Sequence, residues 1–140
     1  MGKLLVNAQT IVNGVDLSDH AYSVTVNGQA ADEETTAMGA QGKSRLPGLK
    51  DESFEIEWRQ DFAAGKVDAT LQPIYANGTA VTVEVRPTIA ARSATNPAYV
   101  GNSCYLLDYD PIAGQVAKTM NTKSKFVVDG QTTAIQRLTS

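Results

Sequence analysis

The feature that most constrains the fold is the alternation of apolar and charged residues in residues 48–62, GLKDESFEIEWRQDF. Three apolar side chains fall on one side of an extended chain and three charged ones on the other: Phe54, Ile56 and Trp58 against Glu55, Glu57 and Arg59. A period of two predicts a β-strand with one face in a core and one face exposed. This segment also carries the single tryptophan of the chain. We therefore expect it to be the central strand, and the function depends on what its charged face meets.

Two further segments repeat this alternation. Residues 22–27 place Tyr22, Val24 and Val26 on one side and end at Asn27-Gly28, a dipeptide typical of turns. Residues 81–86 alternate valines with polar residues, so that Val81, Val83 and Val85 share a face. The sequence thus predicts a core built from these six residues together with Phe54, Ile56 and Trp58.

The rest of the chain predicts more short strands and one helix. Strands are expected within residues 8–17, with a turn at Asn13-Gly14, and at 33–36, 103–109, 116–121 and 123–128, with a last short strand near the C-terminus. Residues 66–77 have the apolar spacing of a helix that stops at Asn77-Gly78. The total, about eight strands and one short helix with frequent turn signals, predicts a mainly β fold, an antiparallel sandwich or barrel. A chain of 140 residues fits one such domain.

Residues 37–48, AMGAQGKSRLPG, interrupt this pattern. They contain three glycines and one proline and almost no apolar periodicity. The segment predicts a long loop or a projecting hairpin, and loops of about 12 residues without structure are usually functional or disordered. A contact arm and a merely mobile loop both fit the sequence.

Composition and motifs exclude several functions. A net charge of −3 with singly scattered cations argues against binding of nucleic-acid phosphates. With one cysteine (Cys104, expected to be inert) and one histidine (His20, in a polar turn and expected to be solvated), the chain offers no disulfide framework, no nucleophilic cysteine with a histidine base and no Cys/His metal cluster, and we expect no cofactor. No apolar run approaches the roughly 18 residues of a membrane span. Nucleophile-elbow, phosphate-loop and zinc-protease motifs are missing, and Glu55 and Glu57 lack the aromatic residues that hold a sugar. We expect no catalytic and no metal-binding residues, and a protein that is not an enzyme.

Several segments, taken in order, resemble the tail tube proteins of long-tailed, non-contractile bacteriophages (siphoviruses). The stretches that carry the resemblance are VNGVDLSDHAYSVTVNGQAADEETTAMG, LPGLKDESFEIEWRQDFAAGKVDATL and VTVEVRPTIAARSATNPAYVGN. The likeness runs from about Thr10 to Thr139. It rests on several structural segments in order and not on one catalytic signature.

This resemblance implies a structural virion protein of the phage tail, assembled in the host cytoplasm. Subunits of that family are β-sandwich or barrel domains with a flanking helix. They form rings, typically homo-hexameric, that stack helically into a hollow tube, in which strands from each subunit join an inner barrel around the DNA channel. The implied partners are other copies of the chain, the tape-measure protein, and the tail tip and tail terminator proteins. Viral DNA passes through at ejection without tight binding, and no membrane is involved.

The resemblance assigns provisional roles to two groups of residues. Glu55, Glu57 and Arg59 are candidates for the channel wall, because they form the charged face of the most regular strand. The segment 37–48 is the candidate ring-stacking loop, with Met38, Gln41, Lys43, Arg45 and Pro47 as its contact residues. Two alternatives remain open at this point: a monomeric β-sandwich binding module, and another ring-forming virion part such as a tail terminator.

Overall fold

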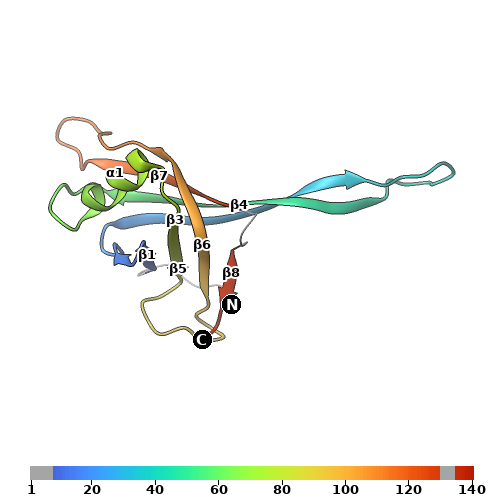
Figure 1. Ribbon diagram of the computed structural model, residues 1–140, viewed down its shortest axis with the longest axis horizontal. Helices are drawn as coiled ribbons and strands as arrows, with labels where there is room; N and C mark the ends of the chain where they lie inside the picture. The colour runs from blue at the N-terminus through green and yellow to red at the C-terminus, as the bar shows by residue number, and fades with distance from the viewer. Residues whose placement is uncertain (1–7, 130–134) are drawn as a thin grey trace.

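The computed structural model describes residues 8–129 and 135–140. Within them the chain forms one helix and eight strands (Figure 1): β1 (Gln9–Val12), β2 (Val15–Asp16), β3 (Ala21–Glu34), β4 (Arg45–Arg59), α1 (Val67–Asn77), β5 (Val81–Arg86), β6 (Ala98–Tyr109), β7 (Asn121–Val128) and β8 (Gln136–Leu138). Every pairing between these strands is antiparallel. The mainly antiparallel β fold with eight strands and one helix, expected from the sequence, is confirmed. The predicted turn that follows β7 includes Gly130, which lies outside the described residues.

The strands belong to a single sheet that does not close into a barrel. Its order is β2-β1-β5-β6-β7-β4-β3, and β8 pairs with β6 outside this path. β6 holds the sheet together, because its first half pairs with β5 and its second half pairs with β7. Register shifts interrupt both pairings, and β5 and β6 run across the direction of β3 and β4 (Figure 1). The sheet thus folds over on itself while its ends stay apart.

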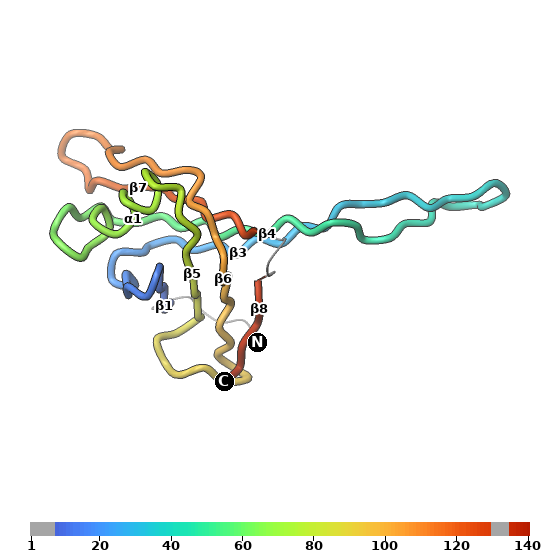
Figure 2. Tube along the Cα trace, viewed as in Figure 1, coloured from blue at the N-terminus to red at the C-terminus, as the bar shows by residue number. Residues whose placement is uncertain are grey.

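β3 and β4 form a hairpin that is much longer than the body of the protein. Their pairing continues from Ala21↔Trp58 to Glu34↔Arg45, and the distal part extends away from all other elements (Figure 2). The predicted turn at Asn27-Gly28 was wrong, because both residues lie inside β3, where β4 supplies a backbone partner to each of them. A separate strand at 33–36 was wrong for the same reason.

The core fills the inner side of the folded sheet. Phe54, Ile56 and Trp58 of β4 are buried there, and Val81, Val83 and Val85 of β5 are buried as well. The Trp58 indole also has a polar partner, since its Nε1 donates a hydrogen bond to Ser124 Oγ of β7 at 2.8 Å. β4 therefore anchors the core through both apolar burial and a satisfied indole N–H.

The inward placement of Tyr22 was wrong. A register shift between Ala21 and Ser23 turns the Tyr22 side chain outward, and it is 42% exposed. Val24 and Val26 do point inward, but they are only partly buried against the core. β3 is an edge strand of the sheet, and among the described residues no strand pairs with it on the side away from β4.

The helix α1 covers one end of the inner side. Val67, Leu71 and Ile74 are its buried residues, and the helix passes through Pro73. It ends at Gly78, which adopts a left-handed conformation (φ 62°) and donates its N–H to the Ile74 carbonyl at 3.1 Å.

The strand expected at 116–121 was wrong. Asn121 is the first residue of β7, and the other residues belong to an exposed loop, residues 110–120. No strand of the described chain pairs with this loop.

Replacing Trp58 with alanine tests whether β4 anchors the core. Because Trp58 is fully buried, we expect Trp58→Ala to lower the free energy of unfolding by about 3–5 kcal/mol, measured by urea denaturation. The control Trp58→Phe keeps most of the apolar volume and should cost clearly less. Equal losses for the two variants would contradict this packing.

Candidate functional site: the outer face and the arm

The charged side chains of β4 lie on the outer face of the sheet, opposite the core. Glu55 stands between Thr25 of β3 and Lys125 of β7 in the strand register. Glu57 lies opposite Lys123 of β7, and the distance from Lys123 Nζ to Glu57 Oε1 is 3.5 Å. The carboxylates of β4 and the lysines of β7 therefore form two neighbouring cross-strand pairs of opposite charge.

Arg59 continues this face toward the helical end of the molecule. Its guanidinium donates a hydrogen bond to Asn121 Oδ1 at 2.7 Å and lies 4.2 Å from the centre of the Tyr22 ring. Burial, followed by a hydrogen bond to Glu57 and the charge of that carboxylate, raises the pKa of Tyr22. Tyr22 is thus part of the polar outer face, where it supports Arg59 by a cation–π contact.

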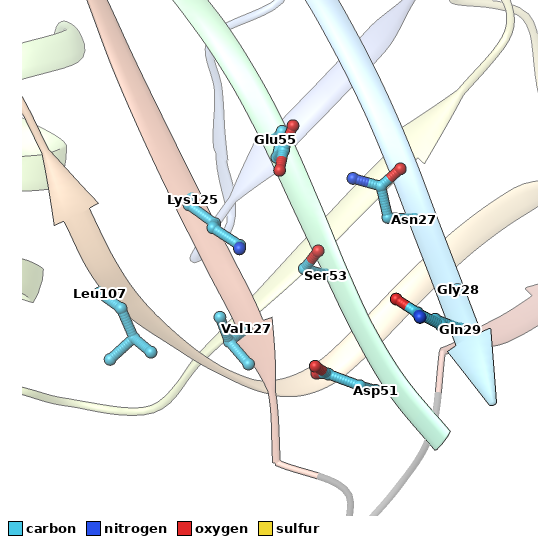
Figure 3. Close-up of a pocket in the computed structure, with 9 residues that line it drawn as sticks. All are labelled: Asn27, Gly28, Gln29, Asp51, Ser53, Glu55, Leu107, Lys125 and Val127. Atoms are coloured by element: carbon cyan, nitrogen blue, oxygen red, sulfur yellow. The ribbon is translucent and has the colours of Figure 1, made fainter. Parts of the chain in front are cut away.

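Part of the outer face is hollowed. A cavity of about 590 Å³ lies over β3, β4 and β7, and Figure 3 shows the side chains that line it: Asn27, Gly28, Gln29, Asp51, Ser53, Glu55, Leu107, Lys125 and Val127. Amide, hydroxyl, carboxylate and ammonium groups dominate this lining. The polar side chains in this lining can bind water. None of the nine residues is aromatic, so they provide no ring on which a sugar or a base could stack.

The charges on this face alternate in sign. Asp108 of β6 lies opposite Lys125, so that lysine has carboxylates on both neighbouring strands. Affinity for DNA phosphates needs cations that no carboxylate offsets. The described part of the outer face offers no cluster of that kind, because Lys123 and Lys125 each stand beside a glutamate.

The residues considered for catalysis are used structurally. Cys104 is buried, its thiol donates to the Gly101 carbonyl at 3.5 Å, and burial raises its pKa to about 11, which disfavours the reactive thiolate. His20 was expected to be solvated, but its side chain is only 16% exposed, and its Nε2 contacts Asp61 Oδ2 at 3.0 Å.

Among residues 8–129 and 135–140, no three His, Cys, Asp or Glu side chains group as metal ligands. In the same ranges, no helix has the length and apolar character to cross a membrane.

The candidate stacking residues all lie on the distal part of the long hairpin, which we call the arm (residues 28–50). Met38, Gln41 and Lys43 occupy its tip, residues 35–44, whereas Arg45 and Pro47 belong to β4. The segment 37–48 forms the end of a projecting hairpin, in which Arg45, Leu46 and Pro47 pair with β3. The five residues are all exposed. At the base of the tip, Thr35 N–H donates to the Ser44 carbonyl at 2.7 Å, so the arm is hydrogen-bonded almost to its end.

The structure adds a feature that the sequence pattern did not identify: besides the short strands β2 and β8, the edges of β3 and of the second half of β6 have no strand partner among the described residues. β3 pairs with β4 alone, so its other edge has no described neighbour. The pairing of β5 with β6 covers Tyr99 to Cys104 and leaves the same edge of β6 unpaired from Tyr105 to Tyr109 among the described strands. Which strand lies at an edge depends on the order of the strands in the sheet. The alternation of apolar and polar residues within one strand does not predict that order.

The buried thiol and phenol predict a loss of stability at alkaline pH. Burial raises the pKa of Cys104 to about 11 and that of Tyr109 to about 12. Both groups keep their protons longer in the folded chain than in the unfolded chain, so their contribution is complete below about pH 9 and is lost as the pH rises toward 12. We expect the free energy of unfolding, measured by urea denaturation, to fall between about pH 9 and about pH 12.

Two matched variants test whether Tyr109 contributes to this loss of stability at alkaline pH. Tyr109→Phe removes the buried hydroxyl, which donates to Asp68 at 2.8 Å, and should flatten the alkaline loss. Tyr105→Phe alters an exposed tyrosine of the same strand and should leave the loss unchanged. An identical pH profile for Tyr109→Phe and the parent protein would contradict the assignment.

No family model and no curated protein matches the sequence, but solved structures match the fold. The tail tube of SPP1 aligns with a TM-score of 0.72 and 14% identity over 96% of this chain and 77% of that chain. A chain of the virion of a native gene transfer agent gives 0.70 and 13% over 94% and 95%. The tail of an empty gene transfer agent particle, determined with C6 symmetry, gives 0.65 and 14% over 84% and 81%. The chain therefore has the fold of these tail and virion structures, as its resemblance to tail tube proteins implied.

Proposed function

We propose that this chain is a structural subunit of the tail tube of a siphovirus-type phage or a related particle. Copies of it assemble into rings, the rings stack into a hollow tube, and viral DNA passes through the tube to the host. The observation that carries the proposal is the shared fold with the SPP1 tail tube over 96% of the chain. Six subunits per ring is the expected number, supported by the C6 symmetry of the similar gene transfer agent tail.

The two unpaired edges provide a way to close a ring. β3, β4, β7 and the second half of β6 lie side by side in the sheet, with the free edge of β3 on one side and Tyr105–Tyr109 of β6 on the other. Antiparallel strands can add to such edges through backbone hydrogen bonds. If the β3 edge of each copy joins the β6 edge of the next, the sheet continues from copy to copy, and closure of the ring leaves neither of these two edges exposed.

This arrangement turns the outer face of β4 toward the channel. The inner face is filled by the core and α1, so the face with Glu55, Glu57 and Arg59 is the one left to form a wall. Carboxylates paired with lysines hold water and present little net attraction to phosphate. DNA can then move along such a wall without being arrested.

The arm supplies the contact between rings. It projects from the body (Figure 1), so it extends beyond the ring to which its own body belongs. The remaining partners in this proposal are the tape-measure protein inside the tube and the tail tip and tail terminator proteins at its ends. The protein would be located in the virion tail after assembly in the host cytoplasm.

Electron microscopy of the negatively stained, purified protein tests this function. We expect hollow tubes of uniform diameter. Single rings that never stack would indicate a ring-forming part such as a tail terminator, and monomers at all concentrations would indicate a binding module; either result would overturn the proposal.

Deleting residues 39–45 tests the role of the arm. The deletion removes the tip and leaves every core residue in place, so we expect folded rings that fail to elongate, observed by microscopy, with an unchanged melting temperature of the body. The control Gly42→Ala changes the same tip at a position where an added Cβ meets nothing within 4 Å, and it should assemble normally. Tubes of normal length from the deletion variant would refute a stacking role for the tip of the arm.

A further inference from the structure

Five exposed apolar residues come from segments that lie at the end of the molecule opposite to the arm (Figure 1). We call this set the end patch: Phe62, Tyr75, Ile112, Val116 and Met120. They come from three separate segments: the turn after β4, the helix α1, and the loop 110–120. Val116 is 98% exposed, which is unusual for a valine and leaves its side chain without cover in a single copy.

Specific contacts hold the segments of the end patch together. Gln60 donates its side-chain N–H to the Pro111 carbonyl at 2.6 Å and its backbone N–H to the Met120 carbonyl at 3.0 Å. The Tyr75 ring of α1 lies 6.3 Å from the Tyr109 ring of β6, centre to centre. The loop 110–120 is thus tied to the turn that bears Phe62, and the apolar residues are presented on a fixed base.

The arm carries apolar side chains that also lack cover. Leu46 and Leu49 lie in β4 beside a register shift opposite Ala30–Asp32, Met38 lies at the tip, and all three are exposed. Leu49 is 89% exposed. A two-stranded ribbon has no interior of its own, and such a ribbon is at best marginally stable alone in water. Burial against another surface would remove these leucines from water and order the arm.

The geometry excludes the same chain as the partner and disfavours pairing between two arms. The arm and the end patch lie at opposite ends of the long axis of the molecule (Figures 1 and 2), so the arm does not reach its own patch. Two arms side by side along their β3 edges would bring the acidic run Asp32, Glu33 and Glu34 against its copy, which like charges oppose. The arm projects about 30 Å, counting roughly ten residues at the rise of a strand. That length is sufficient to reach a neighbouring molecule.

We propose that Leu46, Leu49 and Met38 of the arm bind the end patch of a second copy in the next ring. This inference rests on the proposed function and adds the receiving surface to it. Because the arm and the patch are different surfaces at opposite ends, the contact is head-to-tail and repeats without closing. Each ring then has one end that donates arms and one end that accepts them, and the tube has a fixed direction of growth.

Two complementary variants test the pairing. The arm variant carries Leu46→Asp and Leu49→Asp, and the patch variant carries Ile112→Asp and Val116→Asp. All four positions are exposed in one copy, so both variants should keep the melting temperature of the parent protein. Each variant alone should form single rings, with at least about tenfold fewer stacked rings by microscopy. The matched control Ile89→Asp changes an exposed apolar residue outside both surfaces and should form normal tubes.

Mixing preformed rings of the two variants gives the decisive result. Rings of the arm variant keep an intact patch, and rings of the patch variant keep intact arms, so one kind of contact is possible between them. We expect stacks of two rings and no longer stacks. Tubes of normal length from the patch variant alone, or a mixture that stays as single rings, would overturn the inference while leaving the tail tube function in place. A parent protein that forms neither rings nor tubes would overturn both.

An engineered disulfide between the arm and the end patch tests the same contact in tubes that have already assembled. Leu49→Cys and Val116→Cys in one chain should give a ladder of covalent oligomers when assembled tubes are oxidised, whereas either substitution alone should give none. Cys104 does not interfere because it is buried. Oxidised tubes of the double variant that show only monomer on a non-reducing gel would contradict the contact.

Discussion

The burial of Trp58, Phe54 and Ile56 along one side of β4 is the constraint on which the rest of the structure depends. A strand has two faces, so fixing these three residues in the core fixes Glu55, Glu57 and Arg59 on the opposite face. The register of β4 with β7 then brings the two glutamates beside Lys125 and Lys123. A slip of one residue would bury the charges and expose the tryptophan, which makes the register strongly specified. The polar outer face is thus a direct consequence of how the core is packed.

In a single copy, the same sheet has unpaired strand edges and exposed leucines. One long edge of β3 and part of an edge of β6 have no strand partner in the described chain, and the arm exposes leucines with no interior behind them. Soluble monomers usually protect such edges with charges, bulges or covering loops. In the proposed assembly, lateral contacts pair the strand edges and axial contacts cover the arm, through two separate sets of residues. The proposed ring formation and ring stacking are therefore separable by mutation.

Much of this fold could be predicted from local patterns, because alternation and turn chemistry act over a few residues. The core of β4 and β5, the turn at Asn13-Gly14 and the end of α1 at Gly78 all followed from such signals. Asn27-Gly28 misled the prediction because a distant strand, β4, supplies partners that override the turn preference. Tyr22 and His20 were misplaced because a register shift and a contact with Asp61, 41 positions away, decide their environments. The Glu–Lys pairs, the hollow and the end patch join segments far apart in sequence, so no single stretch indicated them.

In the proposed tube, the outer face of β4 lines the channel. A cryo-EM map of tubes formed by this protein, at a resolution that distinguishes side chains, would locate this face. We expect Glu55 and Glu57 to face the lumen and β3 of each subunit to lie beside residues 105–109 of its neighbour. A map that places these glutamates on the outer wall would contradict it.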